Sequence, residues 1–211
     1  MKSGRPVTSP VPLQDPGLVE RTDLQKALAE PLHDVIHLGS AVAEVRADHQ
    51  RPGVLVDDHE VSADLVVDAS GVHSRIADSL VENSPSFRGF GGVVAISELS
   101  DEPQLSSGYE WLSSGARAGL FPLRRGRTYW YFICDQSDED ATLSLDEVAK
   151  RTRDWPAAFK AAVARTRSEC AYPVAIHARG RPSRLGTDHL SGLMRHMARS
   201  FFRNSSGQSP D

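Results

Sequence analysis

The sequence predicts an α/β (α+β) fold, and three observations support that prediction. A short β-branched run, residues 65–67, ends abruptly in small residues, as a central strand does where it meets a ligand crevice. Apolar runs bounded by turn residues predict short strands at 35–38, 41–46, 53–56, 93–96, 118–123 and 128–134. Helical patterns follow Arg21 and occupy residues 143–153 and 155–165.

The stretch from Ala63 to Arg75 is the centre of this prediction. Its apolar run, predicted to be a buried strand, is followed by Asp68, two small residues and Gly71. Small side chains let a ligand approach the backbone, and glycine permits a positive φ. Ser74, or the turn 72–74, is expected to cap a short helix that runs to residue 80.

The composition is that of an ordinary globular protein. The 211 residues are 39% hydrophobic and 25% charged, with a formal net charge of −4. This small negative charge gives no reason to expect nucleic-acid binding, and no apolar run approaches the ~20 residues of a membrane span. Residues 1–6 lack an apolar signal core, and Cys134 and Cys170 are expected to be free thiols. We therefore expect a cytoplasmic protein.

The Ala63–Arg75 stretch resembles the second flavin fingerprint of the FAD-dependent aromatic-ring monooxygenases, the p-hydroxybenzoate hydroxylase-like flavoproteins. That fingerprint is usually a strand, then Gly-Ala-Asp-Gly, then a Ser and an Arg. Asp68 stands where the family usually has Gly, and Ser70 where it has Asp. The resemblance implies a partial FAD-binding Rossmann-like domain with a β-meander at residues 1–80. It also implies an antiparallel-sheet substrate domain at 81–175, followed by a divergent basic tail at 176–211.

The resemblance implies that Arg21, Val42, Asp68 and Gly71 face FAD. Arg21 opens an Arg-x-x-Leu helix start, and Val42 would meet the adenine through its backbone. No catalytic side chain is expected, because the flavin carries the chemistry. NAD(P)H is the implied co-substrate, and a small organic molecule the implied substrate.

Two of the implied roles have plain structural alternatives. Arg21 is also suited to a surface ion pair with Glu20 or Asp23, with no ligand involved. The Tyr129-Trp130 dipeptide resembles the floor of the family's substrate domain, but Trp130 is equally suited to ordinary core packing.

Two family segments have no counterpart in the sequence. No strand with a Gly-x-Gly-x-x-Gly turn occurs before Arg21, and no Gly-Asp segment occurs beyond residues 185–190. We therefore expect an internal fragment of a monooxygenase that is not active alone. The alternatives are a non-catalytic remnant or partner-binding module, with a partner chain supplying the missing segments, and a flavin reductase of the geranylgeranyl type.

The last segment differs in composition, with six arginines against two aspartates from His177 onward. Residues 190–201 predict a basic amphipathic helix. Its possible roles are contact with a membrane surface or a partner, and packing on its own domain; a third interpretation is a segment read out of frame. His33 and His37 are spaced like metal ligands, but no third ligand is evident, so no metal site is expected.

Overall fold

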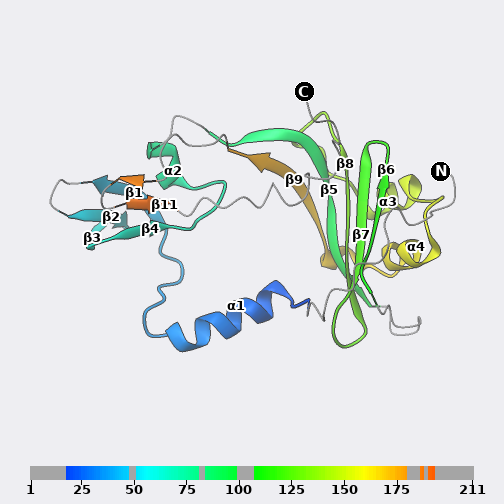
Figure 1. Cartoon of the computed structure of the whole chain (residues 1–211), viewed down its shortest axis with the longest axis horizontal. Coiled ribbons are helices and arrows are strands. Elements are labelled where there is room, and N and C mark those ends of the chain that lie inside the picture. The colour runs from blue at the N-terminus through cyan, green and yellow to red at the C-terminus, as the bar shows by residue number, and fades with distance from the viewer. Residues whose placement is uncertain are drawn as a thin grey trace, which may run out of the picture. The chain divides into compact units, whose positions relative to one another are not determined.

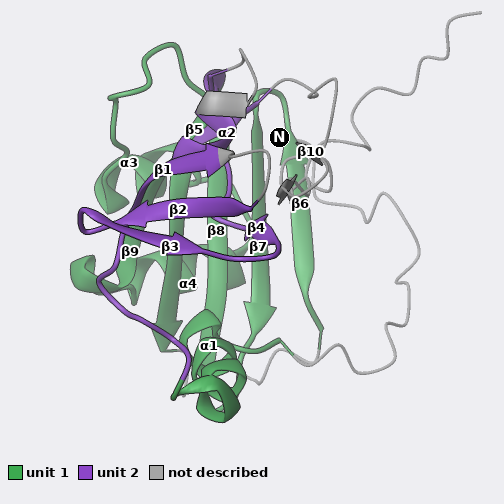
Figure 2. Ribbon diagram, turned by 90° about the vertical axis from the view of Figure 1, so that its left-hand side faces the viewer, with its two compact units in different colours: residues 1–34, 89–175 green, residues 35–88, 176–211 purple. Residues whose placement is uncertain are grey.

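The computed structural model describes residues 18–47, 51–80, 84–98, 107–179, 186–187 and 190–192. The chain forms two compact units, residues 1–34 with 89–175 (unit 1) and residues 35–88 with 176–211 (unit 2) (Figure 2). Two long strands, β5 (Ser86–Glu98) and β9 (Ala171–Ala178), belong partly to each unit. The functional division expected at residues 80 and 175 stays a prediction.

Unit 1 is built on a five-stranded sheet with the order β6-β7-β8-β5-β9 (Figure 1). The strands β6 (Tyr109–Ser113), β7 (Ala116–Pro122) and β8 (Arg127–Asp135) pair antiparallel in succession, and β5 pairs antiparallel with β8. The strands predicted at residues 118–123 and 128–134 are therefore confirmed, and they form a hairpin. The strand predicted at residues 93–96 is longer than expected, because β5 starts at Ser86 and pairs with β8 from Phe90.

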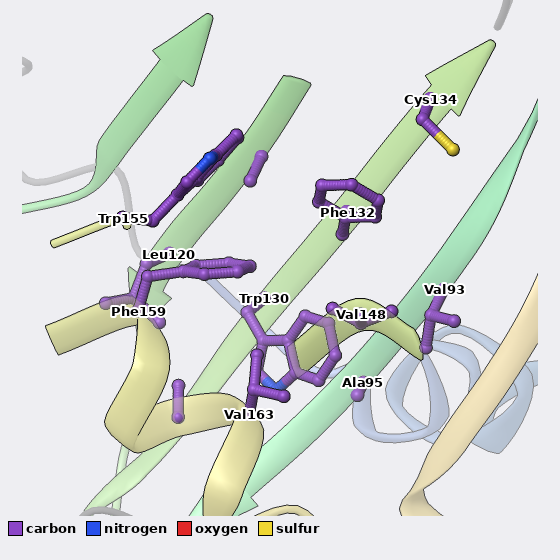
Figure 3. Close-up of a cluster of buried hydrophobic side chains, with 12 residues drawn as sticks. Val93, Ala95, Leu120, Trp130, Phe132, Cys134, Val148, Trp155, Phe159 and Val163 are labelled. Atoms are coloured by element: carbon purple, nitrogen blue, oxygen red, sulfur yellow. The ribbon is translucent and has the colours of Figure 1, made fainter. Parts of the chain in front are cut away.

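The helices α3 (Leu145–Arg151) and α4 (Ala157–Ala164) cover one face of this sheet, and the short helix η2 (Ser168–Cys170) precedes β9. Figure 3 shows the resulting core, in which side chains of β5, β7 and β8 meet Val148 of α3 and Phe159 of α4. Ser144 caps α3 by accepting from the backbone N–H of Glu147 at 3.2 Å, so the helix starts two residues later than the predicted 143.

Side chains along strand β8 point alternately to the helix-covered face of the sheet and to its opposite face. Trp130 and Phe132 are 0% and 1% exposed and belong to the helix-covered core. Tyr129, Tyr131 and Ile133 lie on the opposite face. The indole N–H of Trp130 donates to the hydroxyl of Thr166 at 2.9 Å, so burial leaves it satisfied. Trp130 is therefore a core residue.

The helix α1 (Arg21–Ala29) already contains Thr22 and Asp23, the two residues whose side chains suit an N-cap, and it begins two residues earlier than a cap at Thr22 would allow. Its N-cap is Glu20, and the carboxylate of Glu20 pairs with Arg127 of β8. The helix continues through Pro31 as the short helix η1 (Glu30–Leu32). The strand expected at residues 35–38 is wrong: these residues form turns and loop, and Leu38 is 89% exposed.

Unit 2 contains the predicted meander, in which β1 (Val42–Ala47), β2 (Pro52–Val56) and β3 (His59–Ser62) are neighbours in order. The β2–β3 hairpin turns at Asp57 and Asp58, whose φ values of 47° and 64° are those of a two-residue hairpin turn.

The central strand of the prediction, β4 (Val66–Asp68), pairs in parallel with β11 (Leu190–Gly192) and is followed by α2 (Arg75–Leu80). Strand β11 also pairs antiparallel with β10 (Gly186–Thr187). The prediction of a helix starting at Leu190 is therefore wrong, while the rest of the predicted tail helix lies outside the described residues.

The apolar run at residues 65–67 is less buried than predicted. Leu65 and Val67 are 56% and 51% exposed, because only the face with Val66 and Asp68 is covered.

Among the helices in the described part of the chain, none combines the length and the apolar character needed to cross a membrane.

Candidate functional site

The turn after β4, residues 68–74, is built around the carboxylate of Asp68 and is called the β4 turn below. Asp68 is 7% exposed and accepts hydrogen bonds from the Ser70 backbone N–H at 3.0 Å, the Ser70 hydroxyl and the Ser74 hydroxyl at 2.5 Å. Burial raises the pKa of Asp68, but these hydrogen bonds and the positive charge of Arg179 outweigh burial, so the pKa lies below its ordinary value. The carboxylate is an internal anchor for the turn.

Ser74 connects this anchor to the helix that follows. Its side chain is buried, and its oxygen accepts from the backbone N–H of Ala77 at 3.0 Å while its hydroxyl donates to Asp68. The predicted cap of α2 is therefore confirmed. One hydroxyl fixes both the start of the helix and the end of the β4 turn.

Gly71 provides the backbone conformation that the β4 turn needs. Its φ is +87°, in the region that glycine adopts without strain, and its carbonyl accepts from the backbone N–H of Ser74 at 3.2 Å. A Cβ added at Gly71 would meet no atom within 4 Å. Glycine is thus required by the φ angle, and the space outside the turn is open to a ligand.

The hydrogen-bonding groups of the β4 turn fit the hydroxyl groups of FAD better than its pyrophosphate. Both donors of Ser70 point to Asp68, so the side chain of Ser70 offers a ligand the lone pairs of its hydroxyl oxygen. An accepting group suits the hydroxyls of the ribityl or ribose portion, whereas a pyrophosphate needs donors or positive charge. The turn therefore fits the hydroxyl-bearing part of the cofactor, and its fit to the phosphates is poor.

Three of the four residues predicted to face FAD lie in one unit. Val42 is the first residue of β1 and half-buried, and Asp68 and Gly71 lie in the β4 turn; all three belong to unit 2, where α2 also contacts β1. Arg21 is the exposed first residue of α1 in unit 1. A role in flavin binding remains a prediction for all four residues.

The sheet of unit 1 carries a cluster of aromatic side chains on the face opposite α3 and α4. The rings of Phe121, Tyr129 and Tyr131 lie beside one another there, with centroids 6.3 Å apart in each pair. Gly119 makes this cluster possible, since a Cβ would lie 2.4 Å from the Tyr131 ring and 2.6 Å from the Phe121 ring. We call this cluster of three rings the aromatic face.

A polar cluster lies at the edge of the aromatic face. Nη2 of Arg117 is 2.7 Å from each carboxylate oxygen of Glu110, and the Tyr131 hydroxyl donates to the same carboxylate. Burial, with Glu110 as a second cause, raises the pKa of Tyr131 strongly, so this phenol stays protonated. Among the described residues of this cluster, the positive charge of Arg117 and the negative charge of Glu110 offset each other, so these residues give the aromatic face no strong net charge.

The described residues contain no group of three metal-ligating side chains. Nε2 of His33 lies 3.0 Å from a carboxylate oxygen of Asp34, and both side chains are largely exposed. Cys134 and Cys170 are free thiols, as expected, and burial raises the pKa of Cys134.

Two sets of residues were missed by the sequence analysis. Arg179 contacts the β4 turn from more than one hundred residues away, and no local pattern indicates such a contact. Glu110 and Arg117 lie seven residues apart on the β6–β7 hairpin, whose Ser114-Gly115 turn was a usable signal.

These features define a fold in which a β-meander and a parallel strand with a glycine turn accompany an antiparallel sheet covered by helices. Solved FAD-containing monooxygenase structures share it. The chain matches Klebsiella pneumoniae HpxO complexed with FAD and uric acid with a TM-score of 0.71 and 22% identity, over 83% of this chain and 47% of that one. It matches a salicylate hydroxylase substrate complex with a TM-score of 0.66 and 18% identity, over 82% of this chain and 49% of that one.

Curated relatives agree with this class, although no family model matches the chain. The chain is 30% identical over 135 residues to the 3-amino-4-hydroxybenzoate 2-monooxygenase of Streptomyces cremeus, covering 59% of this chain and 33% of that protein. It is 32% identical over 137 residues to the FAD-dependent monooxygenase esdpE of Penicillium shearii, covering 55% of this chain and 28% of that protein. The homologues of this chain are thus FAD-dependent monooxygenases, and it spans about a third of the length of these two.

Proposed function

We propose that this chain carries part of the FAD site and the substrate-side sheet of an FAD-dependent monooxygenase. The β4 turn is the observation that carries the proposal. Its open glycine backbone and its buried Asp68 anchor stand at the end of a parallel strand, where cofactors bind in open α/β sheets. The homologous monooxygenases supply the reaction class.

In this proposal the whole enzyme uses NAD(P)H and molecular oxygen to hydroxylate or epoxidise a small organic substrate. Bound FAD supplies the redox chemistry, while the protein binds, orients and excludes water. Gly71 and the hydroxyl of Ser70 meet the ribityl chain of the cofactor, Asp68 holds the turn in shape, and Val42 and Arg21 add further contacts. A cytoplasmic location and the domain division at residues 80 and 175 belong to the same proposal.

The aromatic face of unit 1 is the proposed substrate side. Its cluster of three rings offers stacking to a planar substrate, and its protonated Tyr131 remains a neutral phenol at ordinary pH. Because Arg117 and Glu110 neutralise each other, the face suits an uncharged ring better than a carboxylate.

A non-catalytic module that binds a partner chain is the alternative function. The exposed apolar side chains of Leu24, Leu28 and Leu32 along α1 and η1 favour it. The two proposed functions are compatible if the partner chain supplies the phosphate-binding loop that completes the FAD site.

The experiment that tests the FAD site is an NMR titration of the uniformly ¹⁵N-labelled chain with FAD, repeated with ADP. We expect FAD, at concentrations up to the millimolar range, to shift the amides of residues 69–72. ADP shares the adenine, ribose and phosphates but lacks the ribityl chain, so it should leave these amides in place. FAD shifts confined to other residues, or identical shifts with ADP, would contradict the proposed site.

A further inference from the structure

Arg179 lies just after β9 and reaches back to the β4 turn. Its side chain is 4% exposed, and its Nη1 pairs with a carboxylate oxygen of Asp78 in α2 at 2.7 Å. Nε donates to the carbonyl of Val72 at 2.5 Å, and Nη2 donates to the carbonyl of Ser74 at 3.0 Å. One planar guanidinium thereby joins two carbonyls of the turn to the helix that follows.

The geometry of these contacts requires arginine. Its guanidinium presents several N–H donors in a fixed plane, so three acceptors can be held in one orientation, whereas a lysine ammonium is a single compact charge. Ser74 is also the residue that caps α2 and donates to Asp68. Arg179 therefore acts on the same residue that fixes the Asp68 anchor. Its positive charge also stabilises the ionised form of Asp68.

We propose that Arg179 is the positioning residue of the β4 turn, holding Ser70 and Gly71 in the shape that meets the cofactor's hydroxyl-bearing chain. The flavin part of this inference rests on the proposed function above. In this arrangement Arg179 acts on the turn and not on the cofactor, because the contacts of its guanidinium with described residues are with Val72, Ser74 and Asp78.

The first test measures amide hydrogen exchange in the full chain for R179M, R179K and a matched control, D78N. The reporting amides are those of Ser74, Ala77 and Asp78, which bond to acceptors in the β4 turn. R179M removes all three charge-assisted contacts and should speed exchange there by about 100-fold. R179K keeps the charge but loses the fork and should speed exchange about 10-fold.

D78N is the control because it weakens one half-exposed ion pair and leaves both carbonyl contacts in place. It should change exchange at these amides by no more than about threefold. Amides of β7 and β8 in unit 1 should be unchanged in every variant. Exchange in R179M within about threefold of wild type would overturn the proposal. If R179M does not fold, R179K decides by the same comparison.

The second test separates positioning from simple stabilisation by titrating each variant with FAD. In the wild type and in D78N, FAD should shift the amides of Ser70 and Gly71, and in R179M these shifts should disappear although the sheet of unit 1 remains folded. Unaltered FAD shifts in a folded R179M would overturn the positioning role. If FAD shifts neither amide in the wild type, the proposed FAD site fails, and the exchange measurement still decides whether Arg179 shapes the turn.

Discussion

Replacing Phe159 by alanine should destabilise unit 1 by about 4 kcal/mol, near the middle of the range for buried Phe→Ala substitutions. Phe159 is 0% exposed, and its ring lies 5.6 Å from the rings of Trp130 and Trp155 and 5.7 Å from that of Trp111. Truncation loses the buried ring, leaves a cavity that three rigid indoles cannot fill, and removes three aromatic contacts worth about 0.5–1.5 kcal/mol each. These aromatic terms are part of the total and do not add to it.

Urea unfolding followed by tryptophan fluorescence measures this cost directly, since the three tryptophans of the chain all contact Phe159. For an m-value of about 2 kcal/mol/M, the midpoint should fall by about 2 M. The matched control is F159L, which keeps most of the volume and should cost about 1.5 kcal/mol. A cost for F159A below about 1.5 kcal/mol, or one equal to that of F159L, would refute the account of this core.

Three further predictions concern the β4 turn. S74A should destabilise unit 2 by about 2–3 kcal/mol, because it removes the helix cap and one hydrogen bond to a buried carboxylate; faster amide exchange in α2 measures this, and S70A is the exposed comparison. The folded pKa of Asp68 is depressed, so its contribution to stability is present above the unfolded pKa near 3.8 and is lost as pH falls through the folded pKa. D68N should remove this acid-dependent part, and an unchanged profile of stability against pH would argue against the anchor. The 211-residue chain should retain little FAD after desalting, because its sequence contains no Gly-x-Gly-x-x-Gly segment for the pyrophosphate and losing ~4 kcal/mol weakens affinity about a thousandfold. Stoichiometric flavin absorbance after desalting would show that the remaining contacts suffice.

Local chemistry determined much of this protein from the sequence. The strands at 41–46 and 53–56, the two strands of the β7–β8 hairpin and the Ser74 cap of α2 all follow from alternation, turn residues and side-chain hydrogen bonding over a few residues. Gly71 likewise indicated a positive φ in the turn after β4, which the structure shows. Each of these features depends on neighbours in the chain, so each was predictable.

Long-range pairing decided the rest. Glu20 became the N-cap of α1 and the partner of Arg127, residues 35–38 formed no strand, and Leu190 entered a strand beside β4 where a helix was expected. These outcomes depend on which strands and charged side chains lie nearby in space. Sequence periodicity describes only local structure, so it does not predict such distant neighbours.

In the candidate site, too, some features were set by the local sequence and others by long-range contacts. The sequence predicted that Asp68 and Gly71 lie in a turn that faces a ligand, and the ligand part of that prediction is untested. It did not indicate that the Asp68 carboxylate would accept three hydrogen bonds from Ser70 and Ser74. Arg179 was visible only as one charge in a basic segment. Tertiary structure brings its guanidinium to the carbonyls of a turn more than one hundred residues earlier, because buried carbonyls and a buried positive charge each need a partner that the local chain does not provide.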